Sequence, residues 1–126
     1  MVKPERTGNR ESDLIYSTFH RSLPPFCYMS NLDSVEWRAE RGIVAFIETA
    51  IRDQKQTLSQ QIDTKKFEAK LLLELQYRTK IPSFIVFHNL ELTTFQVFKV
   101  TPEIESKMYL WKVLNQVEYK QFIKNL

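Results

Sequence analysis

The chain has 126 residues, of which 43% are apolar and 13% are aromatic, so it can bury the core of one compact domain. Eighteen Lys and Arg residues against fifteen Asp and Glu residues give a net charge of +3, which permits contact with a polyanion but is far from histone-like. With two glycines in all, glycine-rich phosphate loops of the Walker and Rossmann types are unsupported.

The cysteine content and the distribution of apolar residues indicate the compartment. A single cysteine, Cys27, excludes an intramolecular disulfide and argues against a structural zinc site. No apolar run approaches the roughly 20 residues that cross a bilayer, and the amino terminus leads into polar residues instead of a signal-peptide core. The sequence therefore predicts a soluble, intracellular and cytoplasmic protein with no membrane partner.

The chain is predicted to begin with a loose terminus and a short helix. Residues 1–9 lack periodicity, so we expect a flexible N-terminus followed by a single domain over residues 10–126. From Arg10 to His20 apolar residues recur at helical spacing, and the prolines at 24 and 25 prevent the helix from continuing. A brief extended run is expected from Phe26 to Met29.

Two strands are expected next. The segment from Leu32 to Arg38 alternates in polarity, with Asp33 and Trp37 on one face, which predicts a half-buried strand. The segment from Ile43 to Ile47 is apolar without alternation, the pattern of a strand covered on both faces, and Glu48 lies at its carboxyl end.

The central part of the chain is predicted to hold the main helix. Residues 51–62 are polar and typical of a loop or a solvated helical turn. Asp63 or Thr64 can cap a helix that ends before Ile81-Pro82. Its apolar stripe is predicted to be Phe67, Leu71 and Leu75, widened by Leu72 and Leu73.

Two more strands and a closing helix complete the predicted elements. Ser83 to Phe87 and Phe95 to Val100 are rich in β-branched and aromatic residues, and residues 88–92 connect them. Asn115 and Glu118 form a capping-box-like start of a helix whose apolar face is Tyr119, Phe122, Ile123 and Leu126. Five aromatic residues are assigned to the core: Trp37, Phe46, Phe67, Phe84 and Phe87.

The order helix, strand, strand, strand, helix, strand, strand, helix predicts an α/β fold in which helices pack on a mixed sheet. The turn from Arg38 to Gly42 joins the two strands that carry Asp33 and Glu48, so both carboxylates can meet at one end of the sheet. An oxygen-ligated divalent cation could bridge them. Without this topology, paired acidic residues on neighbouring strands are more often surface features than catalytic residues.

The residues Asp33 and Glu48-Thr49-Ala50, together with the strand Pro82 to Phe87 after a long helix, resemble the PD-(D/E)xK superfamily of metal-dependent nucleases over roughly residues 10–100. The resemblance implies a restriction-endonuclease-like αβββαβ core, with a mixed central sheet flanked by helices. It implies a DNA endonuclease that hydrolyses phosphodiester bonds with Mg²⁺ or Mn²⁺. Asp33, Glu48 and the Thr49 carbonyl would hold the metal, DNA would be the partner, and a homodimer would suit cleavage of two strands.

The family motif has a lysine where this chain has Ala50. Residues 48 and 50 share a strand face, so a lysine at 50 would stand beside Glu48 and orient a nucleophilic water, which alanine cannot do. Two explanations remain open: Ala50 is an engineered replacement that inactivates the enzyme, which we favour, or it is natural and the lysine's role has migrated or lapsed. Arg52 and Lys55 are the alternative donors.

Two further residues are candidate outer ligands of the cation. Asn31 shares the face of Asp33, and its amide oxygen can ligate a cation without adding charge. The resemblance implies that an acidic residue of the first helix can complete the site, a role for which Glu11 and Asp13 compete. Glu36 points to the opposite face and is expected to be solvated or ion-paired.

Basic residues supply candidate nucleic-acid contacts, namely Arg52, Lys55, Lys65 and Lys66. For the lysines of the main helix, the solvated face of an amphipathic helix is the stronger interpretation. Gln76 and Tyr77 fit either a nucleic-acid contact or the helix surface. The leading hypothesis is a metal-dependent endonuclease, and its rivals are a catalytically inactive nucleic-acid-binding or assembly module and a structural protein.

Overall fold

The computed structural model describes residues 11–27, 32–101 and 109–126, and the chain forms two compact units, Met1–Asp33 and Ser34–Leu126. The first unit contains the helix α1 (Glu11–Arg21), which confirms the predicted helix. Phe26 lies in a turn that the hydrogen bond from Cys27 N to Pro24 O closes at 2.9 Å, so the extended run expected to start there is wrong at its first residue. Residues 28 and 29 of that run and the flexible terminus at 1–9 lie outside the described residues.

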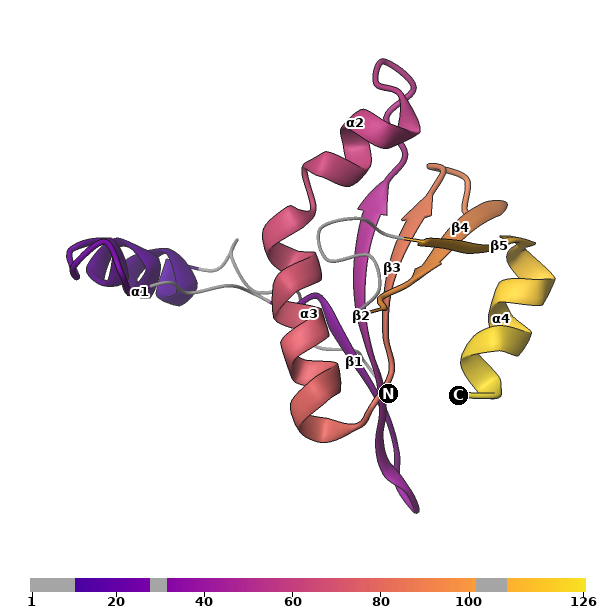
Figure 1. The fold of residues 1–126 in the computed structure, drawn as a ribbon, viewed down its shortest axis with the longest axis horizontal. Helices are drawn as coiled ribbons and strands as arrows, with labels where there is room; N and C mark the ends of the chain where they lie inside the picture. The colour runs from indigo at the N-terminus through magenta and orange to yellow at the C-terminus, as the bar shows by residue number, and fades with distance from the viewer. Residues whose placement is uncertain (1–10, 28–31, 102–108) are drawn as a thin grey trace. The chain divides into compact units, whose positions relative to one another are not determined.

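The second unit is built on a five-stranded mixed sheet in the order β1-β2-β3-β4-β5 (Figure 1). The strands are β1 (Ser34–Arg38), β2 (Gly42–Ile51), β3 (Ser83–His88), β4 (Thr94–Lys99) and β5 (Tyr109–Asn115). The helices α2 (Leu58–Asp63) and α3 (Lys66–Thr79) connect β2 to β3, and α4 (Gln116–Lys124) follows β5. Because β2 and β3 are parallel while all other neighbours are antiparallel, the predicted α/β class with a mixed sheet is confirmed.

Helices α3 and α4 pack on opposite faces of this sheet. Ser83 and Phe84 are consecutive in β3 and therefore point to opposite faces. The Ser83 hydroxyl donates to the Leu72 carbonyl of α3 at 3.1 Å, whereas the Phe84 ring meets Phe122 of α4 edge-on at 5.2 Å. The core on the α4 side is a cluster of buried residues that α4 covers: Ala45, Ile47, Phe84, Val86, Phe95 and Val97.

The strand β1 is shorter than predicted and presents different residues to the interior. It begins at Ser34 instead of Leu32, and a bulge interrupts its pairing with β2 between Glu36 and Trp37. The core assignment of Trp37 is wrong, because 62% of the residue is exposed. β1 is the outer strand of the described sheet, and its half-buried positions are the polar ones, Ser34, Glu36 and Arg38.

The inward face of α3 matches the prediction only in part. Leu72 of the predicted stripe is buried, as is Ala69, which was not predicted. Phe67 is 77% exposed, so the core assignment of Phe67 is wrong. The helix α3 also starts later than expected. The polar segment before it forms the separate helix α2, whose capping box uses Thr57 and Gln60.

The N-cap of α3 is Lys65, so the N-cap predicted at Asp63 or Thr64 is wrong. Asp63 is the last residue of α2, and Thr64 is its C-cap, donating its hydroxyl to the Gln61 carbonyl at 2.6 Å. In contrast, the core positions of Phe46, Phe84 and Phe87 are confirmed, since each is at most 5% exposed.

The carboxyl-terminal helix forms as its capping box predicts. The side chain of Asn115 accepts from Glu118 N at 2.8 Å, and Glu118 Oε1 accepts from Asn115 N at 2.9 Å. The preceding strand β5 was not predicted. Its Trp111 and Val113 are apolar although 41% and 57% exposed, so the sequence of β5 lacks the alternation of apolar and polar residues typical of a strand.

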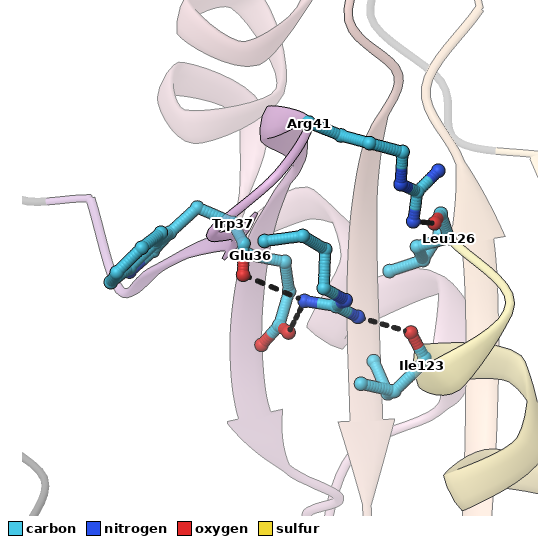
Figure 2. Close-up of polar contacts among 6 residues, drawn as sticks. Glu36, Trp37, Arg41, Ile123 and Leu126 are labelled. Atoms are coloured by element: carbon cyan, nitrogen blue, oxygen red, sulfur yellow. Dashed lines mark hydrogen bonds and ion pairs between the residues drawn. The ribbon is translucent and has the colours of Figure 1, made fainter.

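Two arginines from the β1–β2 hairpin bind the carboxyl-terminal end of α4 (Figure 2). Arg38 donates to the Ile123 carbonyl at 2.5 Å and to Glu36 Oε1 at 3.2 Å, which confirms the predicted ion pairing of Glu36. Arg41 donates to the main-chain oxygen of Leu126 at 2.5 Å. Cations are favoured at this end of a helix, where main-chain carbonyls lack helical partners.

None of the helices within the described ranges has the length and apolar character needed to span a membrane.

The first prediction concerns Tyr119, whose ring stacks on Phe95 at 4.0 Å between centroids. Burial, together with the nearby Glu36 carboxylate, raises the pKa of Tyr119 to about 12. Because the unfolded chain ionises Tyr near pH 10, this residue should lower the free energy of unfolding as the pH rises from about 10 towards 12. Tyr119→Phe should flatten that decline while leaving neutral-pH stability nearly unchanged, as urea unfolding at several alkaline pH values would reveal. An unchanged decline in the variant would contradict the assignment.

Candidate active site

The site centres on Glu48, a carboxylate within a central strand of the sheet. Glu48 is 5% exposed and lies three residues before the end of β2, in register with Ile85 of the parallel strand β3. The sequence placed it at the end of the strand, whereas β2 continues to Ile51. An ionised carboxylate withdrawn from water costs several kcal/mol unless it is paired and hydrogen-bonded. The position therefore requires polar partners.

One partner of Glu48 is Lys65, whose Nζ lies 3.3 Å from Glu48 Oε2. The side chains of Lys65 and Glu48 are 18% and 7% exposed, so the pair is largely withdrawn from solvent. Lys65 precedes Ala69 and Leu72 by four and seven residues, which places it on the inward face of α3. The interpretation of Lys65 as part of a solvated helix face is therefore wrong.

Lys65 stands at a position that usually favours other residues. It is the N-cap of α3, with φ −105° and ψ 18°, and its side chain makes no capping hydrogen bond. N-caps are normally Ser, Thr, Asp or Asn, and a positive charge is disfavoured where the helix dipole is positive. A lysine at this cap and a glutamate in a central strand both reduce stability, which is the pattern expected of a functional site.

A buried glutamine connects β2 to the helices that carry Lys65. Gln61 of α2 is 6% exposed, and its Nε2 donates to the Ile51 carbonyl at 2.6 Å. Its Oε1 accepts from Asp53 N and from the Arg52 guanidinium, both at 2.9 Å. These contacts hold α2 against the end of β2. Lys65, the N-cap of α3, follows four residues after Gln61.

The alternative donors proposed for the missing lysine, Arg52 and Lys55, lie on the loop after β2. The Arg52 guanidinium donates to Gln61 Oε1, to the Gln56 carbonyl at 3.0 Å and to the Asp53 carbonyl, so it is used by the loop after β2. Lys55 is exposed on that loop. The nearby Lys66 is 52% exposed and pairs with Asp63 at 3.5 Å, as expected of a helix surface. The ammonium group beside Glu48 comes from Lys65.

The remaining predicted site residues lie on β2 or before β1. Ala50 is half-buried and shares the strand face of Glu48, whereas the half-buried Thr49 offers its side chain to the other face. Asp33 is half-buried and is the last residue of the first unit. It directly precedes Ser34, which pairs with Ile47, the residue before Glu48. Asn31 and the side chain of Glu11 lie outside the described residues.

Within residues 11–27, 32–101 and 109–126, no group of three or more His, Cys, Asp or Glu side chains could hold a metal ion. Mg²⁺ commonly binds through one or two carboxylates, with water and substrate phosphate completing its shell. Glu48 is one carboxylate of the kind that such a site uses.

A further carboxylate, Glu68, lies one turn after Lys65 on α3 and was not singled out from the sequence. Its Oε2 is buried and accepts no hydrogen bond from the part of the chain that the structure describes. The signal available in the sequence was its i+3 spacing from Lys65. That signal has meaning only once Lys65 is known to face inward.

Comparisons with models of protein families, with curated proteins and with solved structures gave no match to this chain.

The second prediction tests whether the buried pair is coupled. Lys65→Met should lower the free energy of unfolding by about 3 kcal/mol, because Glu48 stays buried without its cationic partner. The double variant Glu48→Gln with Lys65→Met should recover much of that loss. Urea unfolding of the wild type, both single variants and the double variant gives the coupling energy. Strictly additive effects would show that the two groups do not interact.

Proposed function

We propose that this chain is a metal-dependent DNA endonuclease of the PD-(D/E)xK type in which Lys65 supplies the lysine of the active site. The observation that supports this proposal is the 3.3 Å contact between Lys65 Nζ and the buried Glu48 carboxylate. A lysine at position 50 would stand on the same strand face as Glu48. Lys65 brings the same chemical group to the same carboxylate from the neighbouring helix.

The strand topology supports the same proposal. An antiparallel pair, β1 and β2, is followed by a helical crossover and by β3, which is parallel to β2. In the resembled family, the Asp strand and the Glu-x-Lys strand form such a pair, and a helix then leads to the next strand. We therefore include the restriction-endonuclease-like core in the proposal, with β1, β2 and β3 as its equivalent strands.

The residues divide the chemistry between them. Asp33, Glu48 and the Thr49 carbonyl would hold Mg²⁺ or Mn²⁺, which would offset negative charge on the scissile phosphate and acidify a bound water. Lys65 can donate a hydrogen bond to the attacking water and hold it in line with the phosphorus. Its ammonium also places positive charge where negative charge develops on the phosphate oxygens.

This proposal selects between the two explanations of Ala50. An ammonium group already stands beside Glu48, so a lysine at 50 is not needed to complete the set. We therefore propose that Ala50 is natural and that the lysine's role has moved to α3, in place of the engineered replacement favoured on the sequence alone.

A nucleic-acid-binding or assembly module without catalysis is the second candidate. It is favoured by the same contact, because an ion pair can satisfy both buried groups and serve stability alone. The two candidates differ in whether the wild-type protein cleaves DNA, and the first also requires Lys65 for cleavage beyond its effect on folding.

The third prediction tests that requirement. With Mg²⁺ or Mn²⁺, the wild-type protein should cleave single-stranded, duplex or branched DNA, and Lys65→Met should cleave roughly 10²- to 10³-fold more slowly because a preorganised cation is lost. Adding Ala50→Lys to Lys65→Met should restore part of the rate, since a lysine at 50 shares the face of Glu48. Initial rates on labelled substrates provide the measurement.

Two controls separate catalysis from folding. Thermal unfolding identifies the temperature at which each variant remains folded, and rates are compared there. Asp33→Asn should abolish cleavage with a smaller effect on stability. Full activity of folded Lys65→Met would reject the catalytic role of Lys65. No cleavage by the wild type on any substrate would reject the endonuclease and leave the binding module.

A further inference from the structure

A second feature of α3 lies at its opposite end, away from Lys65. A pocket of about 380 Å³ opens there between the helix, the start of β3 and the end of β4. Its lining residues are Leu73, Gln76, Tyr77, Lys80, Pro82 and Lys99. The pocket therefore combines an apolar floor, an aromatic ring and two ammonium groups.

The aromatic ring and the lysines are presented to solvent. Tyr77 is 75% exposed, and Lys80 Nζ lies over its ring at 4.7 Å from the centroid. Lys80 is held in place by its backbone, because it is the left-handed C-cap of α3 with φ 63°, donating to the Gln76 carbonyl at 2.8 Å. Lys99 is exposed at the end of β4. Both positive charges are available to an anion.

Gln76 supports the pocket instead of serving as a ligand. Its Oε1 accepts from Ser83 N at 2.9 Å, and its Nε2 donates to the Val100 carbonyl at 3.2 Å. The nucleic-acid contact considered for Gln76 is thus replaced by a structural role that joins the end of α3 to β3 and to the end of β4. Tyr77, one residue later, stays exposed.

Three lysines and Tyr77 form a row along α3 between its two ends. Positions 66, 70, 73, 77 and 80 recur at intervals of three or four residues, so they lie along one face of α3. The row carries Lys66, Lys70, Tyr77 and Lys80, although Lys66 is paired with Asp63. At 1.5 Å per residue, Tyr77 stands roughly 18 Å from Lys65 along the axis, about the span of five nucleotides of a strand.

We infer that this pocket binds the DNA strand whose phosphodiester reaches Glu48 and Lys65, with a base stacked on Tyr77 and a phosphate held by Lys80 and Lys99. The choice of DNA as the ligand rests on the proposed function. Aromatic stacking with adjacent positive charge is the usual way to bind a strand without reading its sequence. No carboxylate is among the lining residues of this pocket, so nothing in the lining repels the backbone.

The fourth prediction is a binding experiment that does not depend on cleavage. Fluorescence anisotropy is recorded in EDTA with labelled single-stranded and duplex DNA over a series of salt concentrations. Tyr77→Ala should weaken binding roughly tenfold, whereas Tyr77→Phe should retain it, because stacking needs the ring and not the hydroxyl. Replacing Lys80 and Lys99 together by alanine should lower the slope of log affinity against log salt by about 1.5.

The matched control is Lys112→Ala. Lys112 stands over the ring of Trp111 at 4.2 Å, a similar lysine and aromatic pair beside α4 on the other side of the sheet. This variant should bind DNA with unchanged affinity and salt slope. An equal loss in Lys112→Ala would show a general charge effect and would overturn the inference.

The outcomes separate this inference from the proposed function. If the wild type cleaves DNA but Tyr77→Ala binds as the wild type does, the pocket is rejected and the endonuclease stands. If binding depends on Tyr77 while no variant or wild type cleaves, the endonuclease is rejected and the strand site stands. Binding of RNA but not DNA would overturn the assigned ligand.

Discussion

The parallel pairing of β2 with β3 determines how the second unit is built. Parallel neighbours cannot be joined by a tight turn, so the chain must leave the end of β2, cross the sheet and return to the start of β3. The crossover is made by α2 and α3, and the start of α3 therefore lies near the carboxyl end of β2. This topology brings Lys65 to Glu48, although seventeen residues separate them in the chain.

The crossover is held in place by hydrogen bonds that do not involve Lys65 or Glu48. Gln61 binds three polar groups at the end of β2, and Ser83 and Gln76 join the far half of α3 to β3. The inward apolar residues of α3 lie between these two sets of contacts. Lys65 and Glu48 can therefore occupy positions that are unfavourable for stability, because the surrounding contacts fix the helix independently of their ion pair.

The sequence predicted elements whose signal is local. The capping box of Asn115 and Glu118 identified α4, and the apolar run before Glu48 identified a strand covered on both faces. The role of Lys65 could not be predicted, because the inward face of α3 is set by its packing against the sheet, where the Ser83 hydroxyl of β3 donates to the Leu72 carbonyl. The polar residues of α2 before it also gave little periodicity. The core prediction for Trp37 was wrong for another reason, because a strand at the edge of a sheet can bury its polar face against the end of a helix.

The contacts of Arg38 and Arg41 with the end of α4 affect how the sheet unfolds. α4 follows β5 at one edge of the described sheet, yet its last carbonyls are bound by Arg38 of β1 and by Arg41 of the β1–β2 turn at the other edge (Figure 2). One helix thus ties the first strand to the last. Fraying of either edge must loosen α4, and loosening α4 exposes the other edge. The strand β2, which carries Glu48, is therefore expected to open only when the whole sheet opens as one cooperative unit. The amide hydrogens of β2 should then exchange much more slowly than expected for a strand next to an edge strand.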